Sequence, residues 1–238
     1  MATVVAAQRK RPVPSPDPPR QPASAIDRRL QSAMQSTHPL TITDDRRRRA
    51  LPAGGILAGG EGRRFGGVDK GWLRYDGSAF VERVAAALAP QVGWLAISAN
   101  RNLAAYAALG YPVLTDRIGA GPLAGLLRLL EAALAADSGE FLLSAPCDAL
   151  NLPADLGLRM VELQRQSGAD IVVLADDAGL HPVVSLTRCT LAADLARHLQ
   201  AGDYSVQRWQ QRHRRVVAQL GGRLLNINDA SALEAADA

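Results

Sequence analysis

The sequence predicts an α/β fold, in which a Rossmann-like, mostly parallel sheet is flanked by helices. Three observations support this prediction. From Gly54 onward, short apolar runs alternate with segments of helical periodicity. The connections between them are short, which favours right-handed βαβ units. Polar residues follow several of the apolar runs directly, as expected where a parallel sheet binds a ligand at the carboxyl ends of its strands.

The elements of the first half can be placed one by one. The run at 55–58 is a short strand that leads into a glycine-rich loop, and the helical pattern at 79–89 stops at Pro90. A helix closed by Gly110 follows a second strand, and Pro122 suits the first turn of a long helix. We expect strands at 55–58, 94–98, 112–116, 141–145 and 171–175, and helices at 79–89, 102–109, 122–136 and 153–166.

The alternation weakens after the fifth strand. We expect a strand at 183–186, helices at 191–199, 206–212 and 230–236, and an extended segment at 216–220. This part is expected to cover the sheet and to shape the acceptor side of the site.

Composition limits the classes of function. The 238 residues are 47% hydrophobic and carry a net charge of +4, but the charge is uneven. Residues 1–53 hold ten Lys or Arg and four Asp, which leaves 17 basic against 19 acidic residues in the remainder. A slightly acidic body does not favour nucleic-acid binding. No apolar run reaches the ~20 residues that span a bilayer, so we expect no membrane contact.

The two cysteines, Cys147 and Cys189, form no C-x-x-C pair. A structural zinc site is therefore not expected, and a reducing cytoplasm is the expected location.

Residues 1–53 predict a disordered extension before a single domain at 54–238. The segment contains eight of the fourteen prolines and the run Arg46-Arg47-Arg48-Arg49. Such a composition buries too little apolar surface to offset its ordering entropy. A partner-binding arm, an over-long start with Met34 as the internal start, and a transit peptide are the alternatives; the many prolines oppose an amphipathic transit helix.

A glycine-rich, cationic loop follows the first strand. Residues 57–70 contain five glycines, two arginines and one lysine. Glycines let backbone N–H groups face a bound anion, and the cations supply charge, so the loop predicts a polyphosphate site. It is neither a Walker A loop nor a G-x-G-x-x-G fingerprint, because Lys70 is followed by Gly71, and Phe65 stands where the third glycine would be. A glycine-rich turn with solvated cations is the alternative.

Three polar residues stand just after later strands: Asn100, Asp116 and Asp148. Each alone could be a turn residue, since Asn and Asp favour turns. Together with the glycine loop they suit nucleotidyl transfer, which needs charge neutralisation, in-line positioning and usually Mg²⁺. One carboxylate is sufficient protein ligation for Mg²⁺ bound to phosphates.

These motifs resemble the signature of the molybdenum cofactor guanylyltransferases. The resemblance covers about residues 54–238 and departs from the pattern at Gly62, where Ser or Ala is common, and at Phe65, where Met is usual. The matching segments are Leu57-Ala58-Gly59-Gly60, Arg64-Phe65-Gly66, Asp69-Lys70-Gly71, Ser98-Ala99-Asn100-Arg101, Asp116, Gly121-Pro122-Leu123-Ala124-Gly125-Leu126, Pro146-Cys147-Asp148, Leu152-Pro153, His181-Pro182-Val183 and Asn226-Ile227-Asn228.

The resemblance implies a fold of the nucleotide-diphospho-sugar transferase type and a role for each site residue. It implies transfer of GMP from GTP to the terminal phosphate of Mo-molybdopterin, with Mg²⁺ as cofactor and pyrophosphate as leaving group. The implied roles are base and ribose contacts from Leu57, Ala58 and Gly59, pyrophosphate neutralisation by Arg64, triphosphate binding by Lys70, completion of the GTP pocket by Asn100 and Asp116, and Mg²⁺ and nucleotide contact by Asp148. Arg64, Lys70 and Asp148 are the catalytic candidates.

Several alternatives stay open. Lys70 could be a solvated loop lysine, and Asp148 could cap the next helix. His181 could be a hydrogen-bonded core residue or a substrate contact, Cys147 is most simply a small buried residue, and Asn226 and Asn228 could turn the chain or line the pterin side.

The alternative functions are a molybdopterin cytidylyltransferase, a sugar-phosphate nucleotidyltransferase and a non-catalytic chaperone that hands on the cofactor. Relatives of the first two kinds usually have L-A-A-G at the loop, so Gly59-Gly60 favours guanine. Transient contact with cofactor-insertion proteins or apo-oxidoreductases is also expected.

Overall fold

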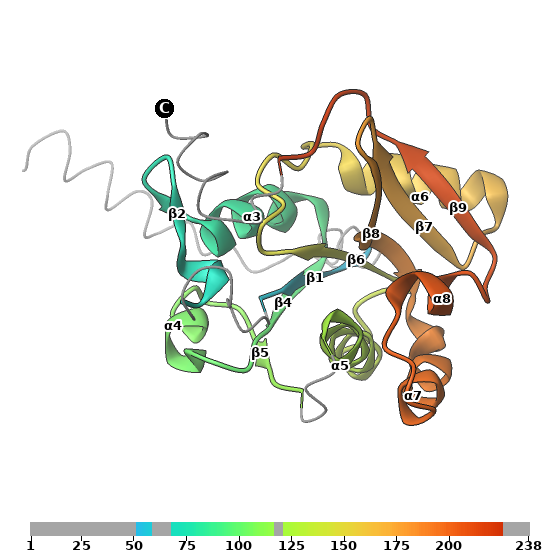
Figure 1. The fold of residues 1–238 in the computed structure, drawn as a ribbon, viewed down its shortest axis with the longest axis horizontal. Helices are drawn as coiled ribbons and strands as arrows, with labels where there is room; N and C mark the ends of the chain where they lie inside the picture. Colours follow the sequence, from blue (N-terminus) through green and yellow to red (C-terminus); the bar gives the residue numbers. More distant parts are fainter. Residues whose placement is uncertain (1–50, 59–67, 117–120, 226–238) are drawn as a thin grey trace, which may run out of the picture. The chain divides into compact units, whose positions relative to one another are not determined.

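A seven-stranded sheet forms the centre of the fold (Figure 1). The computed structural model describes residues 51–58, 68–116 and 121–225. The chain divides into units 1–41 and 42–238, and all described residues belong to the second. The strands of the sheet are β1 (Ala53–Leu57), β4 (Trp94–Ser98), β5 (Val113–Leu114), β6 (Phe141–Pro146), β7 (Ile171–Asp176), β8 (Gly179–Arg188) and β9 (Arg215–Gln219).

Six of these seven strands run in one direction. The order is β5-β4-β1-β6-β8-β7-β9. β1 lies parallel to both β4 and β6, and β4 lies parallel to β5. β8 is antiparallel to β6 and β7, while β9 is parallel to β7. The prediction of a mostly parallel sheet is confirmed.

Helices cover both faces of the sheet (Figure 1). The α-helices are α3 (Phe80–Leu88), α4 (Leu103–Ala107), α5 (Pro122–Ala135), α6 (Leu156–Ser167), α7 (Ala192–Gln200) and α8 (Val206–Gln210). Short 3₁₀ turns are η2 (Lys70–Trp72), η3 (Ala89–Gln91) and η4 (Cys189–Leu191), and a small hairpin joins β2 (Arg74–Tyr75) to β3 (Ser78–Ala79).

The two faces have separate hydrophobic cores. One core joins α3, α4 and α6 to the sheet through residues such as Val84, Tyr106 and Met160. The other joins α5, α7 and α8 through residues such as Leu129 and Trp209. Alternate residues of a strand point to opposite faces, so each buried strand contributes to both cores.

The central strand β1 carries glycines because its neighbours pack directly on its backbone. A Cβ on Gly54 would lie 2.8 Å from side-chain atoms of Val92 and Leu95. A Cβ on Gly55 would lie 2.8 Å from Leu129 of α5. These distances are shorter than van der Waals contact, so α5 approaches β1 closely only because a side chain is missing there.

β8 and α6 begin at other residues than expected. β8 begins at Gly179, earlier than the expected strand at 183–186, because β7 and β8 form a hairpin whose turn is held by the Asp176 carboxylate. α6 begins at Leu156 rather than at Pro153, and the Gln91 side chain bonds both the Pro153 carbonyl and the Gly157 amide. The helix expected at 230–236 lies outside the described residues.

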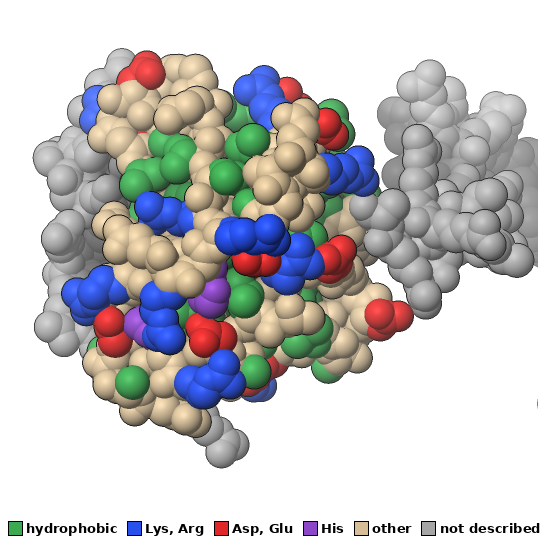
Figure 2. Space-filling model, turned by 90° about the vertical axis from the view of Figure 1, so that its right-hand side faces the viewer, with side chains coloured by type: hydrophobic (Ala, Val, Ile, Leu, Met, Phe, Trp, Pro, Cys, Tyr) green, Lys and Arg blue, Asp and Glu red, His purple; other side chains and the backbone are tan. Residues whose placement is uncertain are grey.

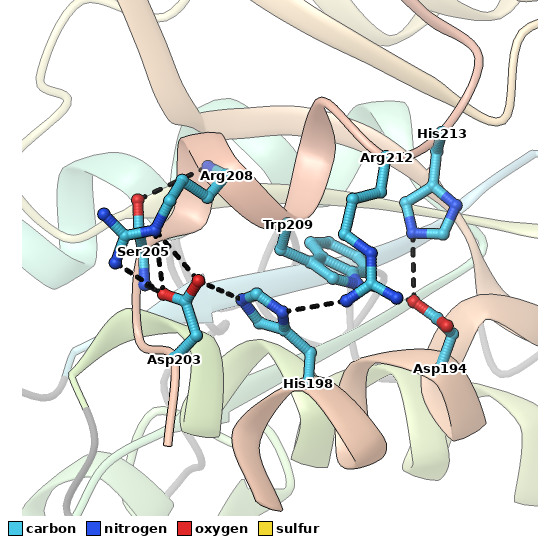
Figure 3. A network of polar contacts seen from close by, with 8 residues as sticks. All are labelled: Asp194, His198, Asp203, Ser205, Arg208, Trp209, Arg212 and His213. Carbon is cyan, nitrogen blue, oxygen red and sulfur yellow. Dashed lines mark hydrogen bonds and ion pairs between the residues drawn. The ribbon is translucent and has the colours of Figure 1, made fainter. Parts of the chain in front are cut away.

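A polar network joins α7 to the segment that contains α8 (Figure 3). Asp194 accepts a hydrogen bond from the Trp209 indole at 3.1 Å and lies 3.1 Å from His213 Nε2. Burial would raise the pKa of Asp194, but the Trp209 hydrogen bond and the His213 charge lower it below its usual value. The buried His198 contacts Arg212 Nη1 at 3.2 Å. The network therefore fixes the chain that leads into β9.

The face formed by α6, β9, α7 and α8 mixes both signs of charge (Figure 2). Ion pairs in these elements and next to them join Arg208 to Asp203 and Arg197 to Asp194.

Within the described ranges, no helix is both long enough and apolar enough to cross a bilayer.

Candidate nucleotide site

Several described residues of the predicted site follow strands whose ends lie at one edge of the sheet. β5, β4, β1 and β6 are adjacent and parallel, so their carboxyl ends lie side by side. The backbone pairing continues past these strands, because the Ala58 amide donates to the Ser98 carbonyl at 2.9 Å and the Cys147 amide donates to the Leu57 carbonyl at 3.0 Å. The residues that follow the four strands are therefore held close to one another.

Asn100 and Asp116 form a reciprocal pair beyond β4 and β5. The Asn100 amide donates to Asp116 Oδ2 at 2.9 Å, and the Asp116 backbone amide donates to Asn100 Oδ1 at 3.0 Å. Both residues come directly after adjacent strands, as the sequence predicts. The two hydrogen bonds set the direction of the Asn100 side chain, while both residues stay accessible to solvent at the sheet edge.

Lys70 and Asp148 form an ion pair across the site. The Lys70 ammonium group contacts Asp148 Oδ2, and the two residues are 78 positions apart. Asp148 is only 7% exposed. A buried carboxylate needs a compensating partner, which Lys70 supplies. The pair shows that the glycine-rich loop returns its lysine to the end of β6.

The turn that carries Lys70 is anchored by its neighbour Asp69. The Asp69 side chain accepts hydrogen bonds from the Gly71 amide at 3.2 Å, from Asn102 Nδ2 at 2.9 Å and from the Tyr106 hydroxyl at 2.7 Å. Burial and then the hydrogen bond to Asp69 raise the pKa of Tyr106 far above its usual value, so its hydroxyl remains a donor.

The long helix α5 lies tightly against the strand ends. A Cβ on Gly125 would lie 2.7 Å from both Leu57 Cδ2 and Ser98 Oγ. Gly125 therefore lets the first turns of α5 approach the ends of β1 and β4. This explains in physical terms why the segment Gly121-Pro122-Leu123-Ala124-Gly125-Leu126 contains its second glycine.

Part of the predicted loop falls outside the described residues. Gly59, Gly60, Arg63 and Arg64 lie there, and so do Gly62 and Phe65. Leu57 and Ala58 are described and buried between β4 and β6. The Ala58 amide donates to the Ser98 carbonyl, and the Leu57 carbonyl accepts from the Cys147 amide. A carbonyl oxygen can accept two hydrogen bonds, so the Leu57 carbonyl can still accept a second one.

The Asp148 carboxylate suits a cation whose other ligands are substrate phosphates and water. Asp148 is the one predicted metal ligand, and the described ranges contain no cluster of three or more His, Cys, Asp or Glu side chains that could hold an ion. Mg²⁺ is commonly bound by one or two carboxylates together with substrate phosphates and water. The buried carboxylate of Asp148 therefore fits Mg²⁺ delivered with a nucleotide.

The side chains of Cys147 and His181 both interact with groups inside the protein. Burial and then the Asp148 charge raise the pKa of the Cys147 thiol, which keeps it neutral and unreactive. His181 Nε2 lies 2.8 Å from Asp176 Oδ2. This agrees with the interpretation of His181 as a polar residue with a partner inside the protein.

The chain after β9 returns to the site along the sheet edge. The Leu224 amide donates to Asp176 Oδ2 at 2.6 Å, and the Leu150 amide donates to the Leu225 carbonyl at 3.0 Å. The Leu225 amide also bonds Asn151 Oδ1. Leu225 is therefore fixed beside the loop that follows Asp148, while Asn226 and Asn228 lie outside the described residues.

Three residues of this neighbourhood had no role in the sequence interpretation: Asp69, Asn102 and Tyr106. Asp69 was visible as part of Asp69-Lys70-Gly71, but its side-chain partners Asn102 and Tyr106 lie more than thirty positions away. Asn102 has φ 50°, a left-handed conformation that Asn adopts more readily than most residues. An Asn at the first position of the helix predicted at 102–109 was the one local signal available.

Comparison with known proteins gives one consistent result. Residues 54–217 match the family described as MobA-like NTP transferase domain. The chain is 41% identical over 169 residues to the molybdenum cofactor guanylyltransferase of Ralstonia nicotianae, which covers 66% of this chain and 81% of that protein. It is 39% identical over 192 residues to the protein of the same name from Cupriavidus pinatubonensis, covering 77% and 94%.

A solved structure with the same fold is the molybdopterin-guanine dinucleotide biosynthesis protein A of Archaeoglobus fulgidus. The TM-score is 0.62 at 18% identity, with 78% of this chain and 96% of that chain covered. This likeness supports the α/β nucleotidyltransferase fold.

Proposed function

Because the chain belongs to the molybdenum cofactor guanylyltransferases, whose MobA-like NTP transferase domain it contains, we propose that it transfers GMP from GTP to the terminal phosphate of Mo-molybdopterin. The products are Mo-molybdopterin guanine dinucleotide and pyrophosphate. The single observation that supports this most strongly in the structure is the ion pair of Lys70 and Asp148 at the carboxyl edge of the sheet.

The nucleotide is proposed to lie across the ends of β1, β4 and β5. The carbonyl oxygens of Leu57 and Ala58 suit the N–H groups of a guanine edge, and Gly59 would extend this contact. Asn100 and Asp116 complete the pocket, with the Asn100 side chain oriented by its two hydrogen bonds to Asp116. Preorganised groups of this kind lower the cost of ordering on binding.

The triphosphate is proposed to lie between the glycine-rich loop and Asp148. Lys70 would bind its oxygens, and Arg64 would neutralise the departing pyrophosphate. A lysine and a carboxylate already in contact provide one group for the phosphates and one for a cation that accompanies them. Mg²⁺ held by Asp148 would supply charge neutralisation at the phosphates.

The reaction is an in-line displacement at the α-phosphorus. A terminal phosphate oxygen of Mo-molybdopterin forms a bond to the α-phosphorus of GTP, and the bond from that phosphorus to the oxygen bridging to the β-phosphate breaks. The electron pair leaves with pyrophosphate. Lys70 and Arg64 stabilise the charge on the leaving group, and no covalent enzyme intermediate is required.

Nucleotide preference tests the proposal against its nearest alternative. The full chain is incubated with Mo-molybdopterin and Mg²⁺, and turnover is compared with GTP and with CTP. Turnover with GTP supports guanylyl transfer. Efficient turnover with CTP and none with GTP would identify a cytidylyltransferase instead, and binding of Mo-molybdopterin without turnover by either nucleotide would favour the chaperone.

Other parts of the proposal concern the whole chain. We expect the reaction in the cytoplasm and transient contact with cofactor-insertion proteins or apo-oxidoreductases, which receive the product.

Residues 1–53 are proposed to be an extension that takes no part in the chemistry, and residues 54–238 are proposed to be the nucleotidyltransferase domain. The family match, which begins at residue 54, supports this division.

A further inference from the structure

Asp69 is a buried carboxylate next to the proposed phosphate-binding lysine, and it is only 6% exposed. Three donors surround it, of which two come from α4 and the residue before it: the Tyr106 hydroxyl at 2.7 Å and Asn102 Nδ2 at 2.9 Å. The third is the Gly71 amide. A carboxylate in such a place is costly unless hydrogen-bonded, so these contacts determine where the turn can lie.

Tyr106 holds the same turn by packing. Its side chain is fully buried, and its ring centroid lies 5.2 Å from that of Trp72. A Cβ on Gly71 would lie 2.3 Å from the Tyr106 oxygen, so the glycine backbone rests directly on the hydroxyl. Residues 69, 71 and 72 are therefore all in contact with Tyr106, and Lys70 lies between them.

Asn102 connects this turn to the segment that follows β4. Its backbone is left-handed, with φ 50° and ψ 35°, and its side chain turns to Asp69. Two positions earlier, Asn100 is paired with Asp116. The short segment after β4 thus contains Asn100, which is proposed to bind the nucleotide, and Asn102, which bonds the residue that anchors the lysine turn.

We propose that Tyr106 and Asn102 are positioning residues that act on GTP through Asp69 and Lys70. Their contacts are with Asp69 and, for Tyr106, with the ring of Trp72. By fixing the Asp69 carboxylate they fix the backbone of Lys70, from which its flexible four-carbon side chain reaches Asp148 and the phosphates. A small misplacement of such a group is enough to cost about 10²-fold in rate. This inference rests on the proposed function, because it assumes that Lys70 binds the triphosphate.

Two conservative substitutions remove the contacts separately. Tyr106→Phe removes one oxygen and keeps the buried ring. Asn102→Gly removes the amide and keeps access to the left-handed backbone, which glycine adopts without strain. Tyr204→Phe, in an exposed tyrosine, is the matched control. Each variant is examined in the full chain for thermal unfolding without nucleotide, for the Kd of Mg²⁺–GTP, and for kcat and KM.

The expected result is a loss of GTP affinity that depends on Lys70. Because each substitution loosens the turn that presents Lys70 and leaves the lysine itself in place, Tyr106→Phe and Asn102→Gly should each weaken GTP binding about tenfold. In a Lys70→Met background the same substitutions should cause no further loss, since the group they position is gone. The KM for GTP should rise, while the KM for Mo-molybdopterin stays unchanged.

The double-mutant comparison separates this inference from the proposed function. Losses that add fully to that of Lys70→Met, or variants with wild-type affinity for GTP, would overturn the positioning role while leaving guanylyl transfer intact. A wild-type chain that binds no GTP would instead overturn the proposed function, and this inference with it.

Discussion

Lys70 lies against the carboxylate of Asp148, with its ammonium group on Oδ2, although the two residues are 78 positions apart. The contact brings the end of the glycine-rich loop to the end of β6. The lysine neutralises a carboxylate that is almost completely buried. When Mg²⁺–GTP binds, the proposed function requires Asp148 to turn to the cation and Lys70 to the phosphates.

Removing either partner should therefore slow transfer strongly, while the protein, although less stable, still folds. We expect Lys70→Met and Asp148→Asn each to lower kcat/KM for GTP by about 10²- to 10³-fold, the usual effect of losing one preorganised electrostatic group. Steady-state kinetics with thermal unfolding as a folding check measure this.

The matched control for this pair is Arg159→Met. Arg159 is on the surface of α6, in an ion pair with Asp155, and exposed pairs contribute little. Its kinetics should equal those of the wild type. Near-normal turnover by Asp148→Asn would contradict the assignment of the cation to this carboxylate.

Gly71 should tolerate no side chain while Tyr106 keeps its hydroxyl. The added Cβ of Gly71→Ala would lie 2.3 Å from the Tyr106 oxygen, and overpacking of this kind costs about 1–3 kcal/mol of unfolding free energy. In a Tyr106→Phe background the nearest ring atom would be 3.2 Å away, so the loss should shrink. Urea denaturation measures both.

Gly157→Ala provides the control, because its Cβ would meet atoms of Gln91 no closer than 3.4 Å. It should leave stability nearly unchanged. Equal losses from Gly71→Ala with and without the hydroxyl would show that the contact with Tyr106 does not explain the glycine.

The Asp176 carboxylate should give the fold a pH-dependent part of its stability. The hydrogen bond from the Leu224 amide, aided by His181 and the Ala178 amide, lowers the pKa of Asp176 to about 2, against the opposing effect of burial. A carboxyl group whose pKa is lowered by folding stabilises the fold at pH values above its ordinary pKa of about 3.9. This stabilisation is lost as the pH falls towards 2.

Asp176→Asn should consequently lower the urea midpoint at neutral pH. The gap from the wild type should stay constant from about pH 7 to about pH 5 and narrow as the pH falls below about 4. Asp155→Asn, at an exposed pair on α6, should show almost no gap. A gap of the same size at pH 3 and pH 7 would contradict the role of the charge on Asp176.

Deleting residues 1–48 should leave GTP transfer unchanged. The cut keeps Leu51 and Pro52, and it preserves the hydrogen bond from the Gly93 amide to the Pro52 carbonyl at 3.0 Å. Kinetics of the shortened and full chains measure the effect. A lower kcat/KM in a shortened chain of unchanged thermal stability would assign the extension a part in the reaction.

The strands of the sheet could be predicted because their signals are local. Apolar runs with polar residues at their ends placed β1, β4 and β6 to within one or two residues, and the parallel order then brought Asn100, Asp116 and Asp148 to one edge. The reversed direction of β8 was not predicted, because its hairpin depends on the Asp176 side chain folding back on the turn.

The hairpin of β2 and β3 was not predicted either, although the sequence contains a local signal for its turn. Asp76 and Gly77 both have positive φ, 50° and 75°, as in the type I′ turns that favour Asp-Gly between paired strands. The sequence shows this dipeptide directly. By contrast, the anchoring of Asp69 by Asn102 and Tyr106 depends on packing between segments that no local pattern connects.

The fate of the labelled phosphates of GTP tests the central proposal most directly. The full chain is incubated with Mo-molybdopterin, Mg²⁺ and GTP labelled at either the α- or the γ-phosphate. We expect the α-label to appear in Mo-molybdopterin guanine dinucleotide and the γ-label in pyrophosphate. Recovery of the γ-label on Mo-molybdopterin, or of the α-label only in free guanine nucleotides, would contradict it.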